Sequence, residues 1–343
     1  MKLRLKDIAD RVNVSTATVS NALNGNVGVS QPVRDKIFAV AKDMGYIPPK
    51  PRKDALPFVR LILYKSNGMV VMDTLFFSEL IEAIQSECQR VGLELLISHI
   101  NKYSDPSYEK QIQAFVSEKC AGIILLGTEM NRDELLPFLS AQSPLVVLDN
   151  LFRDEIVHSV VMNNFKAGFI GTKALIDAGH RNIGCITSSV SFNNMEERVQ
   201  GMRFCLYDHK LNSNPSIWLV RPNINDAYED MKALIRQAEE IPTAFFSCND
   251  LMAIGCMRAL QEAGYRIPDD ISIVGMDDTA VCLACTPALT TVKVFRRELG
   301  IVAIRALLQM ADDIQTCSVK IMVEVELVRR ASVKELNHIE KNE

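Results

Sequence analysis

Short apolar runs alternate with amphipathic segments over most of this chain. Each run is continuous, which is typical of strands buried on both faces of a parallel sheet. The runs predict strands at Val59–Tyr64, Leu93–Ser98, Ala121–Leu126, Leu145–Leu148, Val160–Met162, Ile183–Ile186, Ile217–Val220, Thr243–Phe246 and Ile271–Val274. Predicted helices between them include Phe77–Arg90, Lys166–Ala178, Met195–Asp208 and Leu251–Ala263. Alternation over this length favours an α/β core of two doubly wound parallel-sheet lobes, with a ligand cleft between them.

The first 46 residues follow a different pattern, which predicts three short helices. Ile8, Ala9 and Val12 share one face of the first helix. Ser15 is a suitable N-cap for a second helix from Thr16 to Asn24, and Gly25 is a natural stop after it. Ser30 is the expected N-cap of a third helix. The residues of this helix that recur at helical spacing and are expected to face the core are Ile37, Val40, Ala41 and Met44. Two helices joined by a three-residue turn form a helix-turn-helix pattern.

Charge is distributed unevenly between this head and the rest of the chain. Residues 1–60 contain 11 basic and 5 acidic residues, whereas the remaining 283 contain 27 basic and 37 acidic ones. A basic head on an acidic body favours contact between the head and a polyanion such as DNA, although a solvated surface gives the same pattern. On the second helix a polar face of small residues is suited to a major groove, and it holds Thr16, Ala17, Ser20, Asn21 and Asn24.

Composition narrows the class of protein further. The 343 residues are 48% hydrophobic and contain no apolar run near the roughly 18 residues of a membrane span. Because no secretory signal is recognisable at the N-terminus, we expect a cytoplasmic protein whose nine cysteines are reduced. Cys282 and Cys285 form an isolated C-x-x-C pair, which we expect to serve packing. With no P-loop, G-x-S-x-G or metal spacing, we expect no cofactor and no metal site.

Several long motifs resemble the lactose-repressor (LacI/GalR) family of transcriptional regulators. They are LKDIADRVNVSTATVSNALNG, VSQPVRDKIFAVAKDMGYIP, AGHRNIGCIT, NDLMAIGCMRALQEAGYRIPDDISIVGMDD and PALTTVKVFRRELG, in the order of that family. The resemblance implies a helix-turn-helix head and a core similar to periplasmic sugar-binding proteins. It also implies a homodimer that binds a pseudo-palindromic double-stranded DNA operator.

Domain boundaries follow from this resemblance together with the composition. We expect the head at 1–46 and a proline-rich linker at 47–58. The first lobe, which forms much of the family's dimer interface, is expected at 59–161 plus about 292–316. The second lobe is expected at 162–291 plus about 317–331, and a short charged tail at 332–343. The tail lacks the heptads of a tetramerisation helix, so we expect a dimer.

The resemblance assigns DNA contacts to residues of the head. Thr16, Ala17 and Asn21 would read bases, and Ser15, Ser20, Asn24 and Ser30 would hold phosphates. Many family members have Arg where this chain has Asn21, and Asn pairs with adenine whereas Arg pairs with guanine. A second departure is Pro48-Pro49-Lys50-Pro51, which stands where the family has a short hinge helix. Arg52 and Lys53 are the alternative contacts there, to phosphates or a narrow minor groove.

The resemblance also points to an effector site between the lobes. The candidate residues are Phe76, Phe77, Asp149, Arg198, Asn249 and Asp277, and their polar members suit the hydroxyls of a sugar. Residue type alone favours structural roles for the polar members, namely an exposed helix position for Arg198, a helix cap for Asn249 and a turn for Asp277. Core packing suits the phenylalanines equally well. We therefore expect a repressor controlled by a small polar ligand. The alternatives are a co-repressor ligand, a sugar receptor that does not bind DNA, and a sugar-metabolising enzyme, for which the cleft offers no nucleophile.

Overall fold

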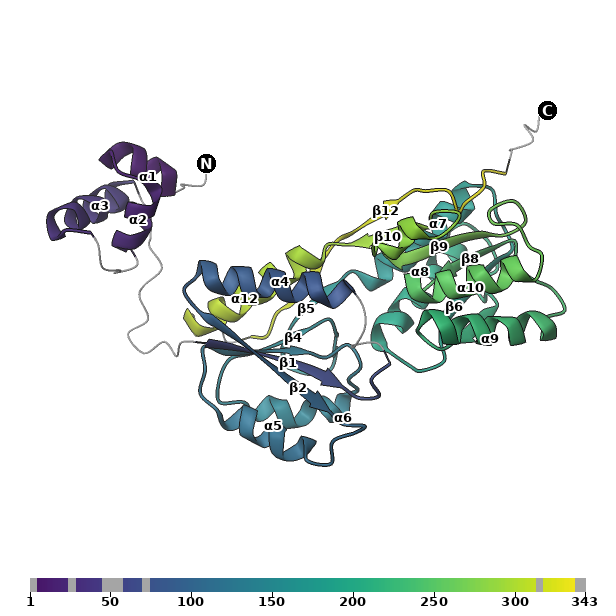
Figure 1. Cartoon of the computed structure of the whole chain (residues 1–343), viewed down its shortest axis with the longest axis horizontal. Helices are drawn as coiled ribbons and strands as arrows, with labels where there is room; N and C mark the ends of the chain where they lie inside the picture. Colours follow the sequence, from purple (N-terminus) through teal and green to yellow (C-terminus); the bar gives the residue numbers. More distant parts are fainter. Residues whose placement is uncertain (1–4, 24–28, 45–57, 70–74, 313–316, 337–343) are drawn as a thin grey trace. The chain divides into compact units, whose positions relative to one another are not determined.

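The computed structural model describes residues 5–23, 29–44, 58–69, 75–312 and 317–336 (Figure 1). The chain divides into two compact units, residues 1–55 and residues 56–343. We call the first unit the head and the second the core.

The head contains three helices that share a small apolar centre. They are α1 (Leu5–Val12), α2 (Thr16–Leu23) and α3 (Gln31–Asp43). Ile8, Val19 and Ile37, one from each helix, are fully buried against one another. The helical spacing of apolar residues therefore predicted this bundle correctly. The helix end expected at Asn24 and Gly25 lies outside the described residues.

The first lobe of the core is built on a six-stranded parallel sheet in the order β11-β5-β4-β3-β1-β2. Its strands are β1 (Phe58–Lys65), β2 (Glu94–Asn101), β3 (Gly122–Leu126), β4 (Leu145–Leu148), β5 (His158–Met162) and β11 (Lys320–Val323). Figure 1 shows α4 (Leu75–Arg90) and α12 (Arg296–Asp312) on one side of it. On the other side lie α5 (Tyr108–Ser117) and α6 (Arg132–Leu135), and α6 continues into the 3-10 turn η1 (Leu136–Ser140).

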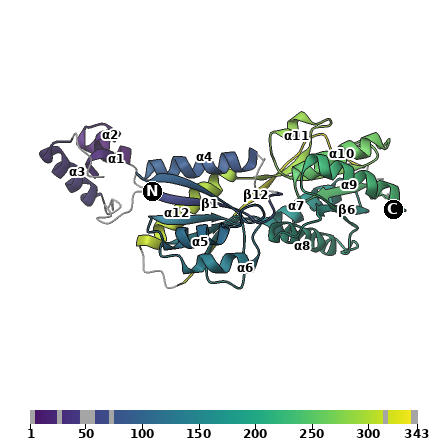
Figure 2. The same cartoon turned by 60° about the horizontal axis from the view of Figure 1, so that its bottom comes forward.

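The second lobe has a sheet of the same size in the order β12-β10-β9-β8-β6-β7. Its strands are β6 (Ile183–Ser188), β7 (Ile217–Val220), β8 (Ala244–Ser247), β9 (Ser272–Asp277), β10 (Thr290–Val294) and β12 (Val325–Val328), and only β12 is antiparallel to its neighbour. The lobe also contains α7 (Asn164–Asp177), α8 (Asn193–Asp208), α9 (Ile224–Gln237), α10 (Asp250–Glu262) and α11 (Val281–Ala284). In this lobe α7 packs on α8 and α9 packs on α10 (Figure 2).

Successive residues of one strand supply two separate apolar clusters in the first lobe. Leu61 belongs to the cluster that contains residues of α4 and α12, whereas Ile62 belongs to the one that contains residues of α5. Because side chains alternate across a strand, a continuous apolar run fills both faces of a sheet. This explains why the predicted strands were recognisable. Among the described residues, no helix is long and apolar enough to cross a membrane.

Two of the expected boundaries between the lobes are wrong. β10 pairs with β9, so residues 292–294 belong to the second sheet and not to the first lobe. β11 pairs with β5, so residues 320–323 belong to the first sheet and not to the second lobe. Both strands lie where the chain passes between the lobes. The order of residues along the chain does not decide which sheet such a strand joins; its pairing partner does.

The expected C-terminal tail is also wrong at its start, because residues 332–336 pack on the second lobe. Ser332 is fully buried, and its hydroxyl donates to the carbonyl of Ile273 at 2.6 Å and accepts from the amide of Thr290 at 2.8 Å. The amide of Leu336 donates to the carbonyl of Ala178 at 2.8 Å. These bonds hold the segment in place by satisfying buried backbone groups. The linker expected at 47–58 lies outside the described residues except for Phe58.

Candidate functional site

A cavity of about 350 Å³ lies between the two lobes of the core. The sequence predicted six residues for such a site, and all of them line this one cavity: Phe76, Phe77, Asp149, Arg198, Asn249 and Asp277. Asp149 follows β4, Asn249 follows β8 and Asp277 ends β9. The carboxyl ends of parallel strands meet at one edge of a sheet, and that edge of each lobe faces the cleft.

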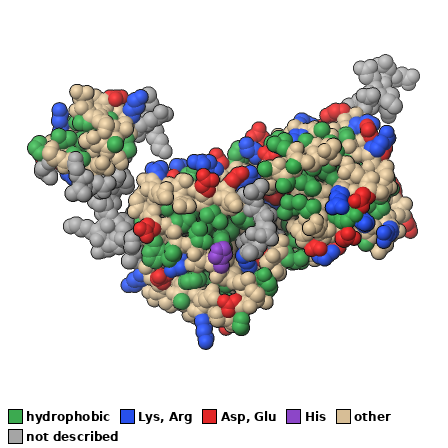
Figure 3. Space-filling view, viewed as in Figure 1, with side chains coloured by type: hydrophobic (Ala, Val, Ile, Leu, Met, Phe, Trp, Pro, Cys, Tyr) green, Lys and Arg blue, Asp and Glu red, His purple; other side chains and the backbone are tan. Residues whose placement is uncertain are grey.

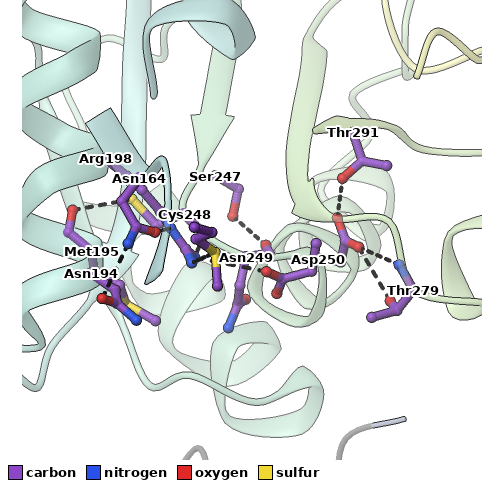
Figure 4. A network of polar contacts seen from close by, with 12 residues as sticks. Asn164, Asn194, Met195, Arg198, Ser247, Cys248, Asn249, Asp250, Thr279 and Thr291 are labelled. Atoms are coloured by element: carbon purple, nitrogen blue, oxygen red, sulfur yellow. Dashed lines mark hydrogen bonds and ion pairs between the residues drawn. The ribbon is translucent and has the colours of Figure 1, made fainter. Parts of the chain in front are cut away.

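Arg198 is held in a fixed position on α8. Its side chain is buried, and Nε donates to Oδ1 of Asn164 at 2.8 Å (Figure 4). Nη1 donates to the carbonyl of Cys248, and Nη2 lies 3.3 Å from the sulfur of Met162. Nη1 also lies 4.0 Å from Oδ1 of Asp277. A guanidinium fixed in this way presents positive charge to the cleft with little freedom to reorient.

Asp277 presents a carboxyl group to the cleft from a left-handed backbone. Its φ is +117° and that of Asp278 is +54°, conformations that Asp tolerates better than most residues. The pKa of Asp277 is raised to about 8, chiefly by burial and also by the charges of Asp250 and Asp149, while the charges of Arg198 and Arg296 oppose the rise. Such a carboxyl group is suited to accept hydrogen bonds from a ligand, which would favour its ionised form.

Asp149 is buried, and both of its carboxylate oxygens have partners within the protein. Thr128 Oγ1 donates to Oδ2 at 2.6 Å, and Nδ2 of Asn194 lies 3.1 Å from Oδ1 and 2.9 Å from the main-chain oxygen. Burial raises the pKa of Asp149 to about 6, against the hydrogen bond from Thr128 and the charge of Arg198. Because Asn194 is on α8, this contact joins the first lobe to the second across the cleft.

Asn249 caps a helix and also faces the cleft. Its Oδ1 accepts from the amide of Met252 at 2.7 Å, so the side chain is the N-cap of α10. This bond uses the oxygen and leaves the Nδ2 amide to act as a donor toward the cavity that the residue lines. The helix-cap interpretation of Asn249 and the site interpretation are therefore compatible.

Aromatic and sulfur-containing side chains form the apolar part of the lining. The rings of Phe76 and Phe77 meet edge to face, with centroids 5.1 Å apart. Sequence reasoning did not assign Asn194 to the site, although it lies four residues before Arg198 and therefore on the same face of α8. The remaining lining residues are Gly68, Met69, Thr128, Met162, Phe192, Met195, Pro222, Asn223, Leu251 and Thr279.

The head carries the second group of predicted site residues. Ser15 caps α2, since its Oγ accepts from the amide of Thr18 at 3.0 Å. Thr16 and Ala17 are exposed in the first turn of α2, and Ser20 and Asn21 are half-buried one turn later. Ser30 is exposed directly before α3, and its carbonyl accepts from the amide of Arg34 at 2.9 Å. Asn24, Arg52 and Lys53 lie outside the described residues.

The C-x-x-C pair lies on and beside α11 as two free thiols. Cys282 is buried, and burial raises the pKa of its thiol. Cys285 Sγ donates to the carbonyls of Cys282 and Pro287, each at 3.3 Å. Within the part of the chain that the structure describes, no group of three or more His, Cys, Asp or Glu side chains is arranged to hold a metal ion.

Two family models match the chain. Residues 4–49 match bacterial regulatory proteins of the lacI family, and residues 172–333 match a periplasmic binding protein-like domain. The chain is 32% identical over 346 residues to the HTH-type transcriptional repressor PurR of Haemophilus influenzae strain PittEE. That similarity covers 97% of this chain and 99% of PurR.

Solved structures share the architecture. The Lac repressor dimer bound to operator and the anti-inducer ONPF matches with a TM-score of 0.73 at 23% identity, over 97% of this chain and 100% of that one. The transcriptional regulator CelR in complex with cellobiose matches with a TM-score of 0.71 at 24% identity, over 96% and 100%. At these identities the likeness establishes the fold.

Proposed function

Because the chain belongs to the LacI family of bacterial regulatory proteins, we propose that it is a transcriptional repressor whose DNA affinity is set by a small polar effector. The observation that carries this proposal is the convergence of the six predicted residues on one cavity between the lobes. The protein acts in the cytoplasm on a double-stranded operator. Like its repressor relatives, it is a binding protein and not an enzyme.

Helix α2 is the part of the head that enters the major groove, with its exposed first turn leading. Thr16, Ala17 and Asn21 read bases, and the amide of Asn21 pairs with adenine. The residues that hold phosphates are Ser15, Ser20, Asn24, Ser30, Arg52 and Lys53. Contacts from cations to phosphates release counterions, so operator affinity falls steeply with salt.

The effector is a sugar or a sugar derivative. Asp277 accepts hydrogen bonds from its hydroxyls, Asn249 donates through Nδ2, and Arg198 supplies the charge beside them. Phe76 and Phe77 cover the apolar face of the ring. The CelR neighbour, solved with cellobiose, supports this chemical class.

Closure of the lobes is how the effector changes DNA affinity. Contacts that cross the cleft, such as Asp149 with Asn194, depend on the separation of the lobes. A ligand that binds one arrangement better than the other shifts the population by its differential affinity, with a typical coupling of about 1–3 kcal/mol. If the arrangement favoured by the ligand binds DNA, the effector is a co-repressor; if it does not, the effector is an inducer.

The protein acts as a homodimer through its first lobe. β2 is an edge strand of the first sheet, and it carries two exposed apolar side chains: Leu96 is 45% exposed and Ile97 is 40% exposed. Figure 3 shows hydrophobic side chains gathered on this face of the first lobe. An exposed apolar edge is unusual in a monomer, because edge strands are otherwise protected from pairing. A two-fold dimer places the two heads on the half-sites of a pseudo-palindrome.

Selection from a randomised duplex pool tests the DNA part of this function. The full-length protein is expected to recover an inverted repeat with an A·T pair at the position that Asn21 reads. Asn21→Arg is expected to shift that position toward G·C, and Asp10→Asn, a change at an exposed position of α1 to which no base contact is assigned, serves as the control. Recovery of no consensus, or of unrelated single sites, would show that the head is not a sequence-specific reader.

A further inference from the structure

One buried arginine contacts both lobes beside the cleft. Arg296 is the first residue of α12, where the chain passes from β10 of the second sheet to the helix that covers the first. Its side chain is only 9% exposed. Arg296 does not line the cavity. It lies within the PALTTVKVFRRELG motif, where no role was assigned to it from sequence alone.

The guanidinium of Arg296 divides its contacts between the lobes. In the second lobe, Nη1 donates to the carbonyl of Asp277 at 2.5 Å, and Nη2 donates to the carbonyl of Asp278 at 3.3 Å. In the first lobe, Nε donates to Oε2 of Glu79 on α4 at 2.8 Å. The guanidinium carbon lies 5.6 Å from the ring centroid of Phe76, which does line the cavity.

The two carbonyls belong to the loop that carries the cleft carboxyl group. Asp277 and Asp278 both have left-handed backbones, and the next amide, of Thr279, donates to Oδ2 of Asp250 at 3.0 Å. The loop is thereby pinned at one side by Asp250 and at the other by Arg296. A shift of Asp277 toward a ligand also moves the carbonyl that Arg296 holds.

We propose that Arg296 is a positioning residue that transmits the state of the Asp277 loop to α4 of the first lobe. This inference rests on the proposed function, in which the effector binds at Asp277. A guanidinium is a rigid planar fork, so its donors cannot follow two partners that move independently. Since Glu79 is half-exposed, its ion pair contributes little to stability, and its effect lies in alignment.

Amide exchange in the ligand-free full-length protein tests the link directly. The reporter is the amide of Thr279 in the second lobe, and the perturbation is Glu79→Ala in the first. Glu79→Ala is expected to speed exchange at Thr279 at least twofold, and to add nothing further in an Arg296→Gln background. Glu82→Ala, a change at an exposed position of the same helix, is the matched control and is expected to leave Thr279 unchanged.

Two results of this experiment would overturn the inference. One is a Thr279 amide that does not respond to Glu79→Ala. The other is an equal response in the presence and absence of Arg296, which would mean that the lobes communicate by another route. Neither result depends on DNA or on a sugar, so each is distinguishable from failure of the proposed function.

Operator release supplies a second readout. With cellobiose as the first probe, followed by other sugars until one changes wild-type affinity, we compare the operator Kd with and without sugar. In Arg296→Gln the fold-change in operator Kd that the sugar causes, in whichever direction, is expected to be at least fivefold smaller than in the wild type. Arg297→Gln, at the exposed neighbouring position, keeps the wild-type fold-change. A wild-type fold-change in Arg296→Gln overturns the inference. A wild-type protein that binds no DNA contradicts the proposed function, and the exchange experiment then decides the inference alone.

Discussion

At the residue scale, the polar side chains of the cleft are of two kinds. Some are held by hydrogen bonds within the protein, and others remain able to bind a ligand. Asp149 and Arg198 have the same sequence signal as Asp277, yet hydrogen bonds within the protein already hold them. Burial raises the pKa of Asp149 only to about 6, because hydrogen bonds from Thr128 and Asn194 help to limit the rise. The pKa of Asp277 rises with burial to about 8, with only the charges of Arg198 and Arg296 opposing it. A carboxyl group buried in this way lowers stability when ionised, a cost that a binding site tolerates for function.

Asp277→Asn is predicted to raise thermal stability at pH 8.5 and to abolish the effector response. A carboxyl group whose folded pKa is about 8 binds its proton more tightly in the folded than in the unfolded chain. Its contribution to stability is therefore complete below pH about 4 and is lost as the pH rises through about 8. The Tm of the wild type should fall across this window relative to that of Asp277→Asn, by calorimetry with both proteins ligand-free. Parallel pH profiles for the two proteins would contradict the assignment.

At the element scale, sequence patterns predicted two kinds of element: helices with one buried face, and strands made of a continuous apolar run. Continuous apolar runs predicted strands in both sheets, and Leu145–Leu148 and Ile217–Val220 match β4 and the edge strand β7 residue for residue. β10 and β11 could not be assigned to a sheet, since their partners are set by how the chain crosses between lobes. In the same way, Asn194 could be assigned to the site only once it was known that α8 begins at Asn193.

Ser15→Ala is predicted to loosen α2 and to weaken DNA binding without changing sequence preference. Loss of an N-cap hydroxyl costs about 1 kcal/mol of helix stability. The amide of Thr18 should therefore exchange faster, and operator affinity should fall by a similar factor for preferred and scrambled sites alike. Ser15→Asp keeps a capping oxygen and is the control for exchange. If Ser15→Ala changed the preferred sequence, Ser15 would have to be reassigned from the backbone contacts to the base contacts.

At the scale of the whole molecule, DNA recognition and ligand binding belong to separate compact units, so communication requires an assembly in which the core determines the spacing of two heads. The exposed apolar residues of β2 are the feature of the core that favours this assembly. Under the proposed function only Thr16, Ala17 and Asn21 of each head read bases, so a single half-site offers few contacts. Dimerisation and operator affinity should therefore change together.

Leu96→Glu is predicted to convert the protein to a monomer. Two glutamates facing each other across a two-fold interface repel, and the apolar contact is lost. Sedimentation velocity should show the monomer, and affinity for a two-half-site operator should fall toward that for one half-site. Leu136→Glu, a change at a comparably exposed leucine elsewhere in the same lobe, is the control. A Leu96→Glu protein that remains dimeric would place the interface elsewhere.

Fluorescence anisotropy of the full-length protein on its selected operator, with and without a panel of mono- and disaccharides, tests whether an effector in the cleft controls DNA affinity. We predict that one sugar changes the operator Kd by about 5–150-fold, the range expected for allosteric coupling. The same sugar should have no effect on Asp277→Asn. Operator binding that no sugar alters, or a sugar effect that survives in Asp277→Asn, would contradict an effector site at the cleft.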